Sequence, residues 1–592
     1  MKTIERISKL RNIMASKNIS AYIIPSSDPH LSEYIPDCWK ARAWLSGFSG
    51  SAGTLVVTTK SAALWTDSRY FLQAEEELNG SGIELCKMGL PNTPSIEKWI
   101  ADQLKKKETV GFDGQLFSHA AAKGLISKLE SKRLKVNYSA DIIDEVWNDR
   151  PELPRGKAFE QELKFAGQTV NEKITLIREN LKKEGANACL ISALDEVAWT
   201  FNIRGNDIDY NPVVLSYGFI SDEEAVLFIK KDKVKEDLAL RLEEQGLEIM
   251  GYNKVKKFIK DLPKKTTVAL DEARVNHTLA SIIKKKVKTK SVLSIPTKLK
   301  ACKNPVELEN IRQSQINDGV AMCEYLSWLE NNVGKEQITE LTIAEKLLEL
   351  RKKQDGFVSE SFATIAGYKE HGAIVHYSAT KDSAAEIKPD GFLLVDSGAQ
   401  YFQGTTDITR TVHLSEPTEK EKADYTLVLK GMIQLSMAKF PAGTRGSQLD
   451  TLARMSIWNN GINYGHGTGH GIGAFLNVHE GPQSIRPNEN PVTIDPGMIM
   501  SNEPGVYRAG EYGIRIENVI ACKDVLENEF GKFYGFETLT LCPIDTKPMN
   551  IDMLSKEERE WLNGYHKLVY DKLLPKLPEE LKGWLKEKTK AI

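Results

Sequence analysis

The order of apolar and polar positions predicts two similar α/β segments in the first half of the chain. The stretches "KLRNIMASKNISAYII" and "LIRENLKKEGANACLI" each have the pattern of a helix, a short turn and an apolar strand. Arg11 of the first stretch matches Arg178 of the second, and this offset of 167 residues is constant along both. Convergent patterning could produce such a likeness, but the constant register favours duplication. We therefore expect two related α/β domains, at about residues 1–157 and 158–302.

Helix-start signals and scattered glycines predict a different third region. Asn304 is suited to an N-cap, Pro305 to the first helical position, and Glu307 completes a capping box. A long amphipathic helix should follow, and then helices mixed with strands that glycines interrupt. The last stretch, from "LSKEEREWLNGYHKL" onward, reads as helices. We expect a third domain at 303–545 with a helical extension at 546–592, in a chain of mixed α/β (α+β) class.

Composition excludes several classes of partner. The 592 residues carry 79 basic and 81 acidic side chains, so no general attraction to nucleic acid or to an anionic membrane is expected. No run of apolar residues is long enough for a transmembrane helix, and the charged start "MKTIERISKLRNIM" lacks the core of a signal peptide. The seven cysteines are scattered and form no CxxC pair. These features predict a cytoplasmic protein with reduced cysteines and no nucleic-acid or membrane partner.

Two aspartates stand where strand-like segments would favour apolar residues. Asp396 directly follows the apolar run "FLLV", and Asp407 lies in a run of threonines. A chain reversal centred near Tyr401 and Phe402 would make the aspartates opposite partners in an antiparallel pair. Carboxylates that face each other in a partly buried sheet repel, so a metal ion between them is expected. The alternative is a pair of strand aspartates that face solvent.

Histidines concentrate in one window, which is where chemistry is expected. Six of the ten lie between His371 and His479. Within "GHGTGHGIG", His466 and His470 are four residues apart, but the alternating glycines oppose a helix. The glutamate of a helical HExxH zinc motif is also missing, because Gly467 stands in its place. In an extended segment the two histidines share one face, which favours a site over isolated structural histidines.

Two glutamates complete the set of candidate ligands. Glu503 follows an apolar run in "MIMSNEPGVY", and in "YGIRIENVI" Arg515 and Glu517 share one face of a strand. Four carboxylates in one pocket would repel strongly unless cations offset their charge. Two divalent metal ions would do so, and the oxygen-rich set favours a hard or borderline ion such as Mn²⁺.

Four motifs together resemble a known family. In order, "VDSGAQYFQGTTDITRT", "HGTGHGIG", "NEPG" and "GIRIENV" resemble the signature of the pita-bread metallopeptidases. "SGFSGSAGT", "LWTDSRYFLQA", "DEVAWTFNIRGNDI" and "GAIVHY" are similar to aminopeptidase P, in particular its long, three-domain cytosolic form. This likeness covers nearly the whole chain. It implies two creatinase-like N-terminal domains, a pita-bread catalytic domain, and metal ligands at Asp396, Asp407, His470, Glu503 and Glu517.

The resemblance also implies an activity and roles for residues. A peptidase of this family would release the first residue of a peptide whose second residue is proline, with a water held between two metal ions as nucleophile. Glu503 would ligate metal and relay the proton, and His479 would stabilise the oxyanion. His376 and His466 would contact substrate around the scissile bond. A homodimer is expected from the family.

Three further residues are predicted to bind substrate. Arg515 could orient a carboxylate or the bound peptide, and Tyr507 could form part of an aromatic wall for the proline ring. The resemblance places Arg69 near the substrate. The alternative for Arg69 is an ion pair with Asp67 or another carboxylate that stabilises its own domain.

Two other functions compete with this one. Prolidase, which cleaves Xaa-Pro dipeptides, shares the five ligands but normally has one N-terminal domain, so the repeated first half argues against it. The same fold also serves as a non-catalytic binding module in some chromatin proteins. Those proteins tend to lose ligands and carry strongly acidic tails, whereas this chain retains the ligands and ends in the mixed-charge "LKGWLKEKTKAI".

Overall fold

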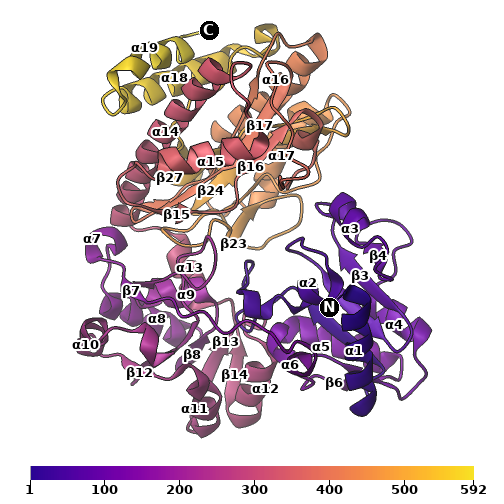
Figure 1. Ribbon diagram of the computed structural model, residues 1–592. Coiled ribbons are helices and arrows are strands. Elements are labelled where there is room, and N and C mark those ends of the chain that lie inside the picture. Colours follow the sequence, from indigo (N-terminus) through magenta and orange to yellow (C-terminus); the bar gives the residue numbers. More distant parts are fainter. Residues whose placement is uncertain (1) are drawn as a thin grey trace. The chain divides into compact units, whose positions relative to one another are not determined.

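The computed structural model describes residues 2–592, which form two compact units (Figure 1). Unit 1 comprises Met1–Glu160 and Gln168–Pro296. Unit 2 comprises Thr297–Ile592 together with the short segment Gln161–Gly167. A piece of the first half of the chain thus belongs to the unit that holds the candidate ligands. No helix in the described part of the chain is both long and apolar enough to cross a membrane.

Unit 1 contains two six-stranded sheets with the same topology. Their strand orders are β4-β3-β2-β1-β5-β6 and β12-β11-β10-β8-β13-β14. The first sheet has β1 (Ala21–Pro25), β2 (Thr54–Thr58), β3 (Ala62–Thr66), β4 (Glu84–Lys87), β5 (Thr109–Gly111) and β6 (Lys135–Asn137). The second has β8 (Ala188–Ile191), β10 (Ser216–Ser221), β11 (Ala225–Ile229), β12 (Glu248–Met250), β13 (Thr267–Leu270) and β14 (Lys288–Ser291). In each, the strand that comes first in the chain has an antiparallel neighbour on one side and a parallel neighbour on the other.

The repeated topology is accompanied by a repeated hydrogen bond. Helices α1 (Thr3–Ser16) and α8 (Val170–Lys183) precede the two sheets. From α1, Arg11 Nε donates to the carbonyl oxygen of Thr58 at 2.9 Å, and from α8, Arg178 Nε donates to that of Ser221 at 2.8 Å. Thr58 is the last residue of β2, which pairs antiparallel with β1, and Ser221 is the last residue of β10, which pairs antiparallel with β8. The offset read from the sequence therefore relates equivalent structural positions, as duplication requires.

Unit 2 begins with the long helix that the sequence predicts. In α14 (Pro305–Asn332), Asn304 Oδ1 accepts hydrogen bonds from the backbone N–H groups of Val306 and Glu307, both at 3.0 Å. Glu307 Oε2 accepts in return from the Asn304 N–H at 3.0 Å. The capping box thus satisfies three backbone donors that the helix itself leaves unpaired.

The strands of unit 2 form small sheets around the candidate ligands. One sheet has β16 (Ile365–Tyr368), β17 (Phe392–Ser397) and β20 (Ile408–His413). A larger one has β21 (Lys439–Pro441), β28 (Gly531–Thr538), β27 (Asn518–Asn528), β24 (Ile499–Asn502), β22 (Gly469–Gly471) and β23 (Glu480–Ile485). Further strands are β15 (Phe357–Glu360), β18 (Ala399–Tyr401), β19 (Gly404–Thr405), β25 (Gly505–Arg508) and β26 (Tyr512–Arg515). Helices α15 (Glu340–Arg351), α16 (Glu419–Ser436) and α17 (Gly446–Trp458) belong to the same unit (Figure 1).

The C-terminal tail is helical, as predicted, and belongs to the core of unit 2. It contains α18 (Lys556–Leu573) and α19 (Glu579–Lys588). Leu562 and Val569 of α18 are fully buried in a cluster with Val428 of α16. Burial of these apolar side chains of α18 contributes to the stability of unit 2.

The buried ring of His566 on α18 predicts a loss of stability at acid pH. Its Nε2 accepts the backbone N–H of Ile544 at 3.2 Å, and burial together with the charge of Arg410 lowers the pKa of His566 to about 4. An exposed histidine in the unfolded chain titrates near 6.5, so the unfolded state takes up this proton first. The contribution of neutral His566 to the unfolding free energy is therefore fully present above pH 6.5 and decreases as the pH falls toward 4.

The variant His566→Gln tests this expectation, because its amide oxygen can still accept the Ile544 N–H. Between pH 7 and pH 5 the unfolding free energy of the parent should fall by about 2 kcal/mol more than that of the variant. Urea unfolding of both metal-free proteins at the two pH values measures the difference. Equal losses in parent and variant would contradict the prediction.

Candidate metal centre

The structure corrects the expected pairing of the two aspartates. Asp396 in β17 pairs with Thr409 of β20, and Asp407 lies just before β20. The chain reverses at Phe402 and Gln403, one residue later than expected, because Tyr401 still pairs with Gly404 and belongs to the strand β18 rather than to the turn. The register therefore shifts by two residues. Since side chains in strands alternate with a period of two, Asp396 and Asp407 still lie on one face.

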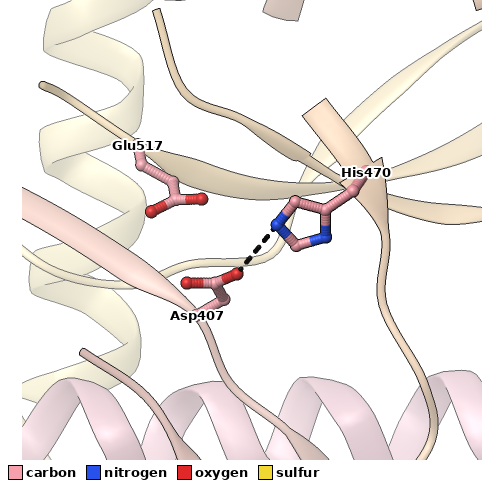
Figure 2. Close-up of side chains that lie close together, drawn as sticks. All are labelled: Asp407, His470 and Glu517. Atoms are coloured by element: carbon pink, nitrogen blue, oxygen red, sulfur yellow. Dashed lines mark ion pairs between the residues drawn. The ribbon is translucent and has the colours of Figure 1, made fainter. Parts of the chain in front are cut away.

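Three candidate ligands converge on one point, one on β22 and two directly before β20 and β27 (Figure 2). One ligand atom each from Asp407, His470 and Glu517 lies within 4.8 Å of the others, and His470 Nε2 is 3.4 Å from Asp407 Oδ2. His470 lies on β22, in the extended conformation that its flanking glycines predict. Figure 2 shows the two carboxylates and the imidazole directed toward one another. This arrangement has the donor types and the spacing of a metal site.

Two more carboxylates border these three groups. Glu503, directly after β24, has Oε1 3.7 Å from His470 Nε2. Asp396 is buried, and its Oδ2 accepts a hydrogen bond from Arg515 Nη2 at 2.7 Å. Its other oxygen, Oδ1, is buried without a hydrogen-bond partner among the described residues. A buried carboxylate oxygen without a donor is costly, and a cation at this point would satisfy it.

The electrostatics of the five groups also favour a bound cation. Burial and the charges on Asp407 and Asp396 raise the pKa of Glu503 to about 7. Burial and the neighbouring carboxylates raise the pKa of Glu517 well above its ordinary range. Burial alone would lower the pKa of His470, but its hydrogen bond to Asp407 and the nearby negative charges raise it to about 9. Without metal the site must retain protons, and divalent cations would displace them.

Arg515 connects the ligands to the surrounding side chains. It is 1% exposed, and its guanidinium donates to Asp396, to Thr409 Oγ1 at 3.2 Å and to the Tyr507 hydroxyl at 2.8 Å. The carboxylate that Arg515 orients in this structure is therefore that of Asp396. Contact of Arg515 with a bound peptide remains a prediction. The Tyr507 hydroxyl also lies 2.8 Å from His466 Nε2, which brings Tyr507 into the same cluster.

The three other candidate histidines lie close to this cluster. The rings of His479 and His470 meet edge to face, with centroids 4.3 Å apart. Burial, then the charges of Arg515 and other nearby cations, lowers the pKa of His466 to about 3, and His376 is close enough to contribute to this shift. His466 is thus held neutral near physiological pH. A neutral ring beside the ligands can accept or donate a hydrogen bond without adding charge.

Hydroxyl groups that the sequence pattern did not reveal support the candidate ligands. Thr409 Oγ1 donates to Glu517 Oε2 at 2.7 Å, and Ser501 Oγ accepts from the backbone N–H of His470 at 3.0 Å. Thr411 Oγ1 donates to the carbonyl oxygen of Arg515 at 2.8 Å. The alternating threonines of "TTDITRT" were the available signal, because they fall on the same strand face as Asp407.

Arg69 lies in unit 1 and forms an ion pair with Asp67. The pair is bidentate, with Nε and Nη2 each 2.8 Å from a carboxylate oxygen. This is the alternative that the sequence analysis considered for Arg69. A role for Arg69 in binding substrate remains a prediction.

Family profiles match most of the chain. The profile of metallopeptidase family M24 matches residues 309–524, and the profile of the C-terminal region of peptidase M24 matches 532–592. Two profiles of the creatinase/prolidase N-terminal domain match residues 6–146 and 149–307. The metal-site strands therefore lie in the region that resembles family M24, and unit 1 in the region that resembles creatinase and prolidase N-terminal domains.

Individual proteins match over nearly their full lengths. Aminopeptidase P2 of Arabidopsis thaliana is 41% identical over 99% of this chain and 88% of that protein. Xaa-Pro aminopeptidase 1 of Dictyostelium discoideum is 39% identical over 99% of this chain and 96% of that protein. The crystal structure of an X-prolyl aminopeptidase from Caenorhabditis elegans, described as a cytosolic enzyme with a di-nuclear active site, is 35% identical with a TM-score of 0.94 and complete coverage of both chains.

Proposed function

Since this chain belongs to metallopeptidase family M24, we propose that it is an aminopeptidase that releases the first residue from peptides with proline in the second position. The membership confirms the resemblance inferred from the motifs and the predicted fold class. The observation that carries the proposal is the convergence of Asp407, His470 and Glu517, which lies in a chain similar to Xaa-Pro aminopeptidases over its whole length.

The site would hold two divalent metal ions. The proposed ligands are the five converging groups, namely Asp396, Asp407, His470, Glu503 and Glu517. The unpartnered Oδ1 of Asp396 and the oxygen-rich donor set support this assignment and favour Mn²⁺ among the common ions. When bound, such ions would lower the pKa of a shared water toward neutrality and thereby supply the nucleophile.

The roles of the protein side chains follow from their positions and charges. Glu503, whose Oε1 is 3.7 Å from His470 Nε2 at the edge of the site, would take a proton from the nucleophile and return it to the leaving nitrogen. His479, edge-on to His470, is placed to donate to the oxygen that becomes negative when the peptide carbonyl is attacked. We assign His376 and His466 to contacts with substrate around the scissile bond.

The preference for proline follows from what proline lacks. A peptide bond that precedes proline has no N–H, and its nitrogen carries a rigid ring. The edge of His466 and the ring of Tyr507, whose centroids lie 5.4 Å apart, could accept this ring as a wall. Arg515 would hold the Tyr507 hydroxyl in place. We further propose a cytoplasmic homodimer; the description of the C. elegans enzyme as cytosolic supports the location.

An assay with paired peptides tests the proposed function. The purified protein is freed of metal with a chelator, reloaded with Mn²⁺, and given an Xaa-Pro-Xaa tripeptide or the matching Xaa-Pro dipeptide. We expect metal-dependent release of the first residue from the tripeptide and poor cleavage of the dipeptide. Release is measured by chromatography of the free amino acid.

The other outcomes distinguish the competing functions. Faster cleavage of the dipeptide would assign the chain to the prolidases. No cleavage of either peptide by protein with two bound metal ions per chain would exclude a peptidase and favour a binding module.

A further inference from the structure

One buried carboxylate outside the metal centre accepts hydrogen bonds from both ends of a single loop. Glu340 is 1% exposed. Its Oε1 accepts from the backbone N–H of Tyr368 at 2.9 Å and from His371 Nδ1 at 2.9 Å. Its Oε2 accepts from the Tyr377 hydroxyl at 2.9 Å and from the backbone N–H of Ala385 at 2.8 Å. Four donors thus offset the cost of burying this charge.

The loop that these donors enclose, residues 369–385, leaves β16 at Tyr368, which pairs with Leu393. Within the loop, the backbone of Gly372 packs closely against that of Gly513 in β26, the strand that carries Arg515 of the metal centre. Its other end is held twice by Glu340, because the Glu340 N–H also donates to the Ala385 carbonyl oxygen at 3.2 Å. The carboxylate itself lies in the first turn of α15, where the helix dipole stabilises negative charge. The loop is therefore attached at both ends to the start of one rigid helix.

The loop carries His376, which directly precedes the anchored Tyr377. We propose that Glu340 is a positioning residue: it holds loop 369–385 so that His376 stands beside the metal centre and can contact substrate. This rests on the proposed function, because His376 has a task only if a peptide binds there. The loop contains little regular structure of its own, only the short 3₁₀ helix Lys369–Ala373, so its shape depends on such anchors.

The variant Glu340→Gln should release one end of the loop without leaving a cavity. An amide offers one acceptor oxygen, and its NH₂ group must face the remaining donors. The Tyr377 hydroxyl can rotate and His371 can change tautomer, but the backbone N–H groups of Tyr368 and Ala385 cannot become acceptors. Whichever way the amide faces, one of these two ends loses its partner. We expect kcat/KM for the tripeptide to fall about 10- to 100-fold, with metal content unchanged.

A double-mutant cycle separates positioning from a merely structural role. If Glu340 acts through His376, then Glu340→Gln should cost about 3-fold or less in kcat/KM when His376 is already alanine. Losses that multiply in the double variant would overturn the proposal, as would parent-like kinetics in Glu340→Gln. The matched control is Glu558→Gln, a buried glutamate of α18 that bonds Lys430 and Gln434, and it should lose little activity.

A second measurement remains informative even if the chain does not cleave Xaa-Pro peptides. Amide hydrogen exchange of the metal-loaded proteins should be faster in residues 369–385 of Glu340→Gln than in the parent. The same residues of Glu558→Gln should exchange like the parent. Faster exchange without any peptidase activity in the parent would refute the proposed function and retain the anchor, whereas unchanged exchange would refute the anchor itself.

Discussion

Replacing Glu517 with glutamine is expected to abolish peptide hydrolysis while leaving the fold of unit 2 intact. Glu517 is 1% exposed and shares the convergence point with Asp407 and His470. Glutamine has the same shape and can keep the hydrogen bond from Thr409, but it is neutral and a weaker ligand for a hard cation. Loss of a metal ion from the reaction removes several kcal/mol of stabilisation of the transition state. We expect kcat/KM to fall by about 10³-fold or more.

The same substitution should not destabilise the metal-free protein, although it abolishes hydrolysis by the metal-loaded one. Without metal, Glu517 lies among three other carboxylates whose charges oppose its own ionisation. Glutamine is neutral without taking up a proton, so the variant avoids the cost that burial and these carboxylates impose on Glu517. The unfolding temperature of the metal-free variant should therefore be no lower than that of the parent. The increase in unfolding temperature on adding Mn²⁺ should shrink, because the bound state gains less from the metal.

Three measurements on one pair of proteins test this prediction. They are the metal content per chain, kcat/KM for the tripeptide, and the unfolding temperature with and without Mn²⁺. Glu537→Gln is the matched control, because Glu537 lies on β28 of the same unit and pairs with Arg312 at the surface. A Glu517→Gln variant that retains two metal ions and more than about a tenth of the activity would show that Glu517 is not a ligand.

The candidate ligands could be proposed from the sequence because their signals are local. A carboxylate in a strand-like run, or a histidine between glycines, is unusual enough to be noticed in a short window. Asp396, His470 and Glu517 were each proposed as ligands in this way. The supporting contacts were not predictable, because Thr409 and Glu340 have ordinary residue types and their partners are distant in the chain. The hydroxyl of Thr409 bonds a carboxylate 108 positions away.

The fold shows the same division between local and long-range information. The duplicated domains were predictable because helix and strand periodicities repeat at a fixed offset. The attachment of segment 161–167 to unit 2 could not be predicted from these periodicities. It depends on tertiary contacts, such as the stacking of Phe165 on Phe402 and the hydrogen bond from Gln161 Nε2 to the Phe402 carbonyl oxygen. The one-residue error in the position of the turn has a similar origin, because the pairing of Tyr401 with Gly404 cannot be read from residue types alone.

Arg410 is expected to be the largest single contributor to the stability of unit 2 outside the apolar core. Its side chain is 2% exposed and lies between β20, the start of β27 and α18. Its nitrogen atoms donate at 2.6 to 3.1 Å to the carbonyl oxygens of Thr409, Glu517, Cys542 and Pro543, the side-chain oxygen of Asn518 and the hydroxyl of Tyr565. One guanidinium thus connects a candidate ligand residue, Glu517, to the C-terminal helix α18.

The variant Arg410→Met should lower the unfolding free energy of unit 2 by about 3–5 kcal/mol, because it leaves several buried oxygens without donors. Tyr565→Phe removes only one of these partners and should cost about 1 kcal/mol. Arg508→Met is the matched control, since the pair of Arg508 with Asp424 is partly exposed and should contribute less.

The Arg410→Met variant should also bind Mn²⁺ more weakly than the parent, because Arg410 holds the backbone of Glu517. Urea unfolding with and without Mn²⁺ measures both effects. If Arg410→Met lowers the unfolding free energy by less than about 1 kcal/mol, water or rearranged side chains must satisfy the oxygens that Arg410 satisfies in the parent.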